Sequence, residues 1–157
     1  MRLWDFVVAI HAAPGVDEGL IALQDNHGQC VSYLLWVVWA AREGRLVRGA
    51  ALAEAAALTH AWEGEVTAPL RVARRNLKRA WPPMDDQARE TFRERVKTEE
   101  FAAERLLLDT LETLTPAPAG LSISVRGALA KAMAAWSPPA PVETAASLLP
   151  MFETFAI

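Results

Sequence analysis

Apolar residues recur along this chain at the three- and four-residue spacing of an α-helix, and no segment alternates as a strand does. A helix with one buried stripe is predicted near the start, from Leu3, Phe6, Val7 and Ile10. Pro14-Gly15 interrupts this pattern, a second helix is expected from about Val16, and Gly28 is placed to end it. Asn-Gly turns between alternating segments are absent, so the pattern indicates an all-α protein.

The most apolar segment is predicted to be the centre of the fold. Residues 30–42 are apolar nearly all round, which is typical of a helix that neighbours pack on from several sides. The run is too short for the ~20 residues that span a bilayer, so we expect a core helix and no membrane segment. The prediction is a compact bundle of six or seven helices around this one.

Two long segments follow the central helix. Residues 50–81 keep a helical pattern, but Pro69 lies inside it, so a kink or break is expected near residues 66–69. Residues 85–114 have the longest clean pattern, and the many charges of their first half predict that it is solvated and projects. Further helices are expected at 124–136 and, after a proline-rich linker at 137–141, in a short apolar segment that ends at Ile157.

Size and composition favour a single domain over residues 1–157, since 52% of the residues are apolar and supply one core. Cys30 is the single cysteine, and the first residues lack the basic start and cleavage site of a signal peptide. We therefore expect a cytoplasmic protein. The net charge of −3 is uneven, with +1 on residues 1–83 and −4 on residues 84–157. Weak attraction between these parts fits one folded unit.

A cluster of basic residues is the clearest local departure from the negative net charge. Its members share one face of a predicted helix: Arg71, Arg74, Arg75, Lys78 and Arg79. The opposite, buried face is expected to consist of Val66, Leu70, Ala73, Leu77 and Trp81. The basic face either is solvated and pairs with the acidic helix that begins at Asp85-Asp86, or binds an anionic partner. Nucleic acid is the least favoured partner, because no nucleic-acid-binding motif or high isoelectric point accompanies the cluster.

A second candidate site combines polar and aromatic residues of the first 40 positions. A carboxylate at Asp25 lies near a helix C-terminus, where the helix dipole disfavours it, so a partner such as His27 is expected. These residues either lock two helices together or line a ligand pocket. The pocket hypothesis names Trp4, Gln24, Asp25, His27, Trp36 and Trp39. The tryptophans are more typical of a core.

Catalytic and metal chemistry find little support in the sequence. Three histidines and one cysteine show no metal-ligand spacing beyond the pair His60 and Glu63, so neither a metal nor a cofactor is expected. No nucleophile accompanies Asp25 and His27, and no glycine-rich phosphate loop occurs. No catalytic residue is therefore assigned.

An ordered series of short motifs resembles a known family. The series comprises Leu3-Trp4-Asp5-Phe6, Pro14-Gly15-Val16, Leu23-Gln24-Asp25-x-His27-Gly28, Leu34-Leu35-x-x-x-Trp39, Trp62, and Pro69-Leu70-Arg71-x-x-Arg74-Arg75-x-Leu77-Lys78. It is similar over about residues 3–80 to a bacterial family of small proteins, the domain of unknown function 2390. The resemblance implies a bacterial cytoplasmic protein and brings no known activity, cofactor or site residue.

Three hypotheses about function follow. The leading one is a non-catalytic adaptor that binds an anionic or protein partner through the basic face. The second is a small-molecule-binding protein, or an enzyme, with a tryptophan-lined pocket between the first three helices. The third is a homodimer built on the long helix 85–114 or on the apolar C-terminal segment.

Overall fold

The computed structural model describes residues 1–120 and 122–155, and within them the fold is all-α. Three helices come first, α1 (Leu3–His11), α2 (Val16–His27) and α3 (Val31–Arg42). A long hairpin follows, made of α4 (Ala50–Trp62), a π-helical turn η1 (Glu63–Thr67), α5 (Ala68–Asn76) and α6 (Asp86–Leu114). The chain then returns to the first helices with α7 (Val125–Ala135), a 3₁₀ turn η2 (Val142–Ala145) and α8 (Leu149–Thr154). Ala156 and Ile157 of the expected apolar end lie outside the described residues.

The bundle is built around α3, as the apolar pattern predicts. Nine of its twelve residues are buried, and α1, α2, α4, α6 and α7 all pack against it. Trp36 and Trp39 are fully buried, and their indole nitrogens donate to Thr115 Oγ1 at 2.7 Å and to the Met1 carbonyl at 2.9 Å. Burial of both indoles with a hydrogen-bond partner anchors the chain start and the end of α6 to the central helix.

The ends of the short helices follow from local chemistry. Gly28 adopts the left-handed conformation with φ of 62° and its N–H bonds to the Gln24 carbonyl, which ends α2 where the sequence predicts. Near the C-terminal end of the chain, the carbonyls of Phe152, Glu153 and Phe155 accept hydrogen bonds from Arg42 of α3. An arginine on the last carbonyls of α8 holds that short helix against α3.

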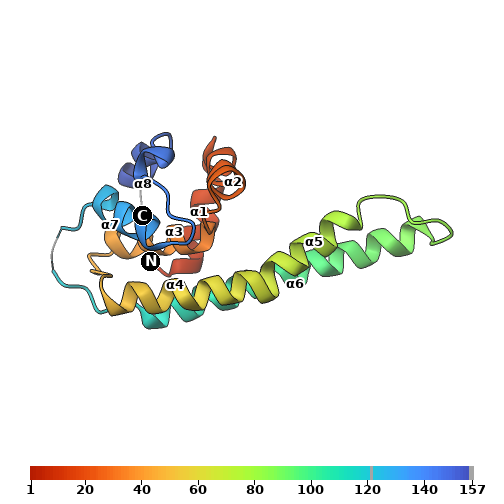
Figure 1. The fold of residues 1–157 in the computed structure, drawn as a ribbon, viewed down its shortest axis with the longest axis horizontal. Coiled ribbons are helices and arrows are strands. Elements are labelled where there is room, and N and C mark those ends of the chain that lie inside the picture. The colour runs from red at the N-terminus through yellow and green to blue at the C-terminus, as the bar shows by residue number, and fades with distance from the viewer. Residues whose placement is uncertain (121, 156–157) are drawn as a thin grey trace.

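The hairpin extends beyond the bundle. Figure 1 shows α4, η1 and α5 as one continuous rod that lies beside α6, and the far end of the pair stands clear of the other helices. Of the kink or break expected near residues 66–69, the break does not occur, since the helix continues through Pro69, and the irregularity there is the π-helical turn η1. The N–H of Ala68 bonds to the carbonyl of Glu63, five residues back. This wider turn lies directly before α5, whose first turn contains the proline, so the helix continues without a break.

The lengths and hydropathy of the helices bear on whether any of them could span a membrane. Among the residues described, no single helix is long and apolar enough to cross a membrane. Together α1 and α2 have the length and composition for it, but their axes are bent by 103°.

Candidate binding surface

The projecting part of the hairpin is the most unusual feature of the molecule. We call residues 68–99 the arm: α5, the connection after it and the first half of α6. No residue of the arm is buried, whereas Thr67 and Glu100 at its base are 1% and 6% exposed. The charged first half of α6 thus projects into solvent, as its charge pattern predicts (Figure 1).

The π-helical turn decides which face of α5 meets α6. An uninterrupted α-helix would direct Val66, Leu70, Ala73 and Leu77 inward, and this is the face expected from the sequence. The wider turn of η1 rotates α5, so that Thr67, Arg71 and Arg74 point toward α6 instead. Of the face expected to be buried, Ala73 and Trp81 are exposed and the other members are half-buried.

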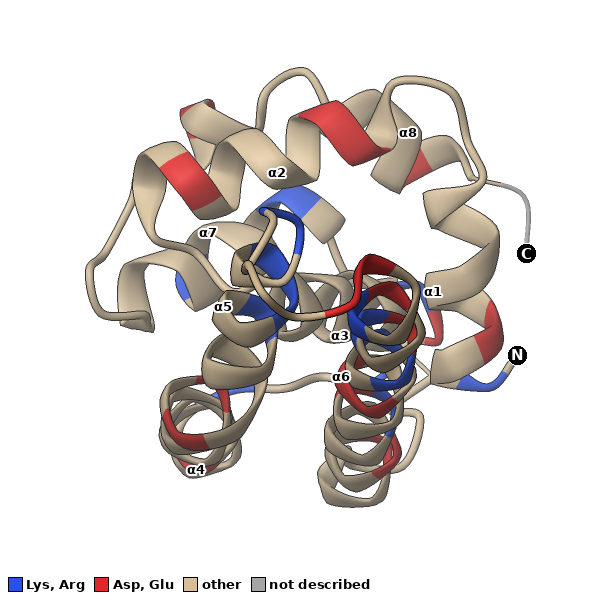
Figure 2. Ribbon diagram, turned by 90° about the vertical axis from the view of Figure 1, so that its right-hand side faces the viewer, with Lys and Arg blue, Asp and Glu red and all other residues tan. Residues whose placement is uncertain are grey.

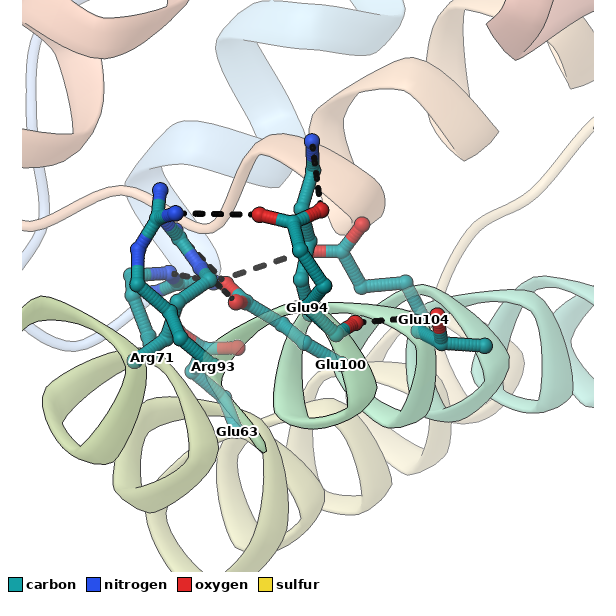
Figure 3. A network of polar contacts seen from close by, with 9 residues as sticks. Glu63, Arg71, Arg93, Glu94, Glu100 and Glu104 are labelled. Atoms are coloured by element: carbon teal, nitrogen blue, oxygen red, sulfur yellow. Dashed lines mark hydrogen bonds and ion pairs between the residues drawn. The ribbon is translucent and has the colours of Figure 1, made fainter. Parts of the chain in front are cut away.

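Ion pairs between the two helices close the base of the arm. Arg71 donates to Glu63 at 2.7 Å and to Glu100 at 3.3 Å, and lies 3.6 Å from Glu104. Arg74 also binds Glu100. Figure 3 shows Arg71 and Glu100 pointing toward each other from the two helices. Two of the five basic residues are therefore neutralised within the molecule, by Glu63, Glu100 and Glu104 and not by Asp85 or Asp86.

The protonation of this network follows from burial and charge. Burial alone would lower the pKa of Arg71, but its hydrogen bond to Glu63 and the charges of the three glutamates outweigh burial, and the net shift is upward. For Glu104, burial raises the pKa more than the charge of Arg71 lowers it. Arg71 is thus a permanent cation, and Glu104 is the carboxylate of the network that binds a proton more readily than a free glutamate.

The remaining basic residues of the cluster point away from this network. Arg75, Lys78 and Arg79 are exposed, and none forms an ion pair with an acidic residue in the described chain. The Arg79 guanidinium lies 4.2 Å from the centre of the Trp81 ring. Trp81 and Met84 in the connection are 41% and 57% exposed. The end of the arm therefore presents free positive charge beside exposed apolar side chains.

Charge is concentrated in the arm more than the net value of the protein indicates. The arm carries nine Lys or Arg and five Asp or Glu, a net charge of +4. The rest of the chain has a net charge of −7. Figure 2, viewed along the hairpin, shows Lys and Arg on α5 and α6, and the acidic residues of α2 on the body above them. A solvated arm of this charge attracts anionic surfaces and is repelled by cationic ones.

The structure does not bring the residues of the predicted pocket together. Asp25 and His27 are exposed, and the only bond of Asp25 among the described side chains is a 3.4 Å contact from Gln24. Trp36 and Trp39 are fully buried in the core. Trp4 is half-buried beneath the guanidinium of Arg105, 5.1 Å from its ring centre.

Two shallow pockets of about 130 and 260 Å³ adjoin Ala41 and Ile123, and none of the six residues of the predicted pocket lines them. Within the described residues, no group of three histidine, cysteine or carboxylate side chains is arranged to hold a metal ion.

Sequence reasoning missed the glutamates that hold the arm. A signal was present, because Glu100 follows Val96 and precedes Ala103 and Leu107 on one helical stripe. A carboxylate inside an apolar stripe requires a cationic partner when it is buried. The missing information was the π-helical turn, without which Arg71 and Arg74 do not face this stripe.

Comparison with known families places the chain. The model of a family described as "protein of unknown function (DUF2390)" matches residues 2–111. The chain belongs to this family. The match extends well beyond residue 80 and includes α4, α5 and α6 up to residue 111, so the arm lies wholly within the family domain. No curated protein and no solved structure matches the chain.

Proposed function

We propose that this member of the family is a non-catalytic binding protein whose arm docks on an anionic surface of a protein partner. The observation that carries the proposal is the free charge of Arg75, Lys78 and Arg79 on an element that projects from the body. Arg71 and Arg74 hold the arm together, and the other three cations have no acidic partner in the described chain.

The chemistry around these cations supports a protein partner. Charge alone steers association, but specific interfaces also need apolar contacts that exclude water. Trp81 and Met84 supply exposed apolar surface next to Arg79. Tryptophan, methionine and arginine are enriched in protein interfaces relative to other surface residues.

Charge reversal at two positions tests the proposal. The variant R75E/K78E changes the net charge of the arm from +4 to 0. The control R48E/K131E changes the net charge of the protein by the same amount, at two exposed body residues without ion pairs. Each protein, tagged, is used to capture binders from lysate of the native cell, and recovery is compared by quantitative mass spectrometry. We expect a defined set of acidic proteins to be retained by the wild type and by R48E/K131E, and to fall about tenfold or more with R75E/K78E.

Arg71 and Arg74 are unsuitable for this test, because their reversal would break the ion pairs at the base of the arm. Circular dichroism of each variant verifies that the helices remain. Equal recovery of every captured protein by the two variants would overturn the proposal.

A further inference from the structure

One side of α6 is exposed over most of the helix and has a regular composition. Six residues at spacings of four, three, four, three and four define this surface, which we call the α6 stripe: Ala88, Phe92, Arg95, Glu99, Ala102 and Leu106. All six are exposed, and Phe92 and Leu106 are 52% and 55% exposed. The stripe runs for about 27 Å, five turns of helix.

The stripe faces away from everything that packs on α6. Its neighbours on the helix, Val96, Glu100, Ala103 and Leu107, face α4 and α5 or the core. On the body side, Arg105 covers Trp4 and Leu108 is 2% exposed. Figure 2 shows the bundle above the two hairpin helices and none of the described chain below them. The two large apolar residues of the stripe, Phe92 and Leu106, thus lie about four helical turns apart on a face that no other described element covers.

The order of residues in the stripe is complementary to its own reverse. Read from the N-terminal end, it runs small, large, positive, negative, small, large. Its spacing is the same in both directions. A second copy placed antiparallel, with a two-fold axis that crosses the stripe midway between Arg95 and Glu99, therefore brings Ala88 against the partner's Leu106 and Phe92 against the partner's Ala102. The same axis places Arg95 against the partner's Glu99.

Both the packing and the charges of such a pair are favourable. Small residues opposite large ones let two helices approach and interdigitate. Arg95 and Glu99 form no ion pair within the described chain, although they are four residues apart on one helix. The two-fold axis would give each of them one partner, so that the Arg95–Glu99 pair occurs twice in the dimer, as in isologous interfaces.

We infer that the protein is a homodimer in which two α6 helices pack antiparallel along the α6 stripe. The cations proposed for partner binding lie outside this stripe, because Arg75 is on α5 and Lys78 and Arg79 are in the connection after it. The two arms would point in opposite directions, and each dimer would present two basic ends.

A charge exchange tests this arrangement in the full-length protein. Dimerisation is measured by sedimentation equilibrium and by light scattering after size exclusion. R95E and E99R each replace two attractive pairs by two repulsive ones, and we expect each to raise the dimer Kd about tenfold or more. The double variant R95E/E99R restores both attractive pairs, so its Kd should return to within about threefold of the wild type.

Two further variants complete the test. K97E changes a charge on the same helix outside the stripe and should leave the Kd unchanged. Ala102→Gln, which keeps the helix but adds bulk at a close contact, should weaken the dimer. A wild type that stays monomeric at about 100 μM overturns the inference, since a contact weaker than that falls outside the range of specific assemblies. A dimer that is insensitive to R95E, E99R and Ala102→Gln overturns it as well, because another surface must then form it.

Discussion

Cys30 shows how burial controls a single side chain in this molecule. The thiol precedes α3 and is 7% exposed, and burial raises its pKa from 9.0 to about 12. Tyr33, one turn further on, has a raised pKa from burial and from the nearby thiol, and its hydroxyl has no hydrogen-bond partner in the described residues. Both groups are thus neutral and inert in the folded protein at physiological pH.

The raised pKa of Cys30 makes stability depend on alkaline pH. In the unfolded chain the thiol ionises near pH 9, whereas in the folded protein it does so near pH 12. Its contribution is fully present below pH 9 and is lost as the pH rises from 9 to 12, by about 1.4 kcal/mol per pH unit. We expect Cys30→Ala to reduce this slope of the free energy of unfolding, measured by urea denaturation at several pH values between 8 and 11.

Tyr33→Phe serves as the comparison for Cys30→Ala. The effect of Tyr33→Phe on the pH slope of the free energy of unfolding should begin about one pH unit above that of Cys30→Ala, since a free tyrosine ionises near pH 10. Identical slopes in the wild type and in Cys30→Ala would contradict the burial of an un-ionised thiol.

Arg71 illustrates a charge whose removal leaves others without a partner. It contacts three glutamates, of which Glu100 is nearly buried. Arg71→Met should lower the free energy of opening of α5 by about 3 kcal/mol, because carboxylates at the base of the arm lose their counter-charge. Amide hydrogen exchange of α5 measures this quantity. The penalty should shrink as the pH falls from 7 toward 4, because burial raises the pKa of Glu104, and once protonated this carboxyl no longer needs the cation.

Arg75→Met is the matched control for Arg71→Met. It removes the same charge from the same helix at an exposed site without an ion pair, so its effect should stay within about 0.5 kcal/mol. Equal effects of the two variants would show that the network does not stabilise the arm.

At the scale of elements, the π-helical turn is the feature that most changes the arrangement. One additional residue in η1 lets α4 direct Ala55 and Thr59 inward and lets α5 direct Thr67 and Arg71 inward. Removal of one residue from η1 should convert this segment to regular α-helix. The same residues of α4 and of α5 would then still face α6. Addition of one residue should rotate α5 by about 100°.

Gly64 is the place to test this effect. It is exposed, and no atom lies within 4 Å of the position a Cβ would take. We expect deletion of Gly64 to change the midpoint of thermal unfolding little, because Arg71 still reaches Glu100. Insertion of one alanine after Gly64 should expose the α5 amides to rapid exchange, since the rotation breaks these ion pairs. A deletion as disruptive as the insertion would contradict the register argument.

The limits of sequence-based prediction are clearest in this same segment. The helix bounds, the central position of α3 and the projection of the first half of α6 follow from periodicity and charge, because each depends on residues close in sequence. The face of α5 does not follow, because a shift of hydrogen bonding from four to five residues leaves no mark on apolar spacing. For the same reason the basic cluster was predicted as five equivalent charges, although Arg71 and Arg74 differ from Arg75 in their surroundings. The pocket hypothesis combined residues that are close along the chain but differ in burial. Trp36 lies in the core, whereas Asp25 lies on the surface.

The whole molecule combines two parts of unequal packing. The body is held by a continuous apolar core around α3, whereas the arm has no buried residue and depends on its base network and on exposed ion pairs. Exposed pairs such as Arg93 with Glu94 contribute little each and weaken in salt. Regions with few buried contacts open locally at a lower free energy than the global unfolding of the protein.

This difference in packing between arm and body predicts two distinct rates of amide hydrogen exchange. Amides of the arm between residues 76 and 95 should exchange orders of magnitude faster than those of α3, in which nine residues are buried. An increase of NaCl from about 0.05 to 1 M should speed exchange in the arm, because it screens the ion pairs, and should leave α3 unchanged. Binding of an anionic partner to Arg75 and Lys78 should slow exchange in the arm alone, since a ligand stabilises the folded form that it binds. Uniform protection across arm and body would show that the hairpin is stabilised by contacts other than those described. A salt effect of equal size in α3 would show that screening of the arm's ion pairs does not explain its faster exchange.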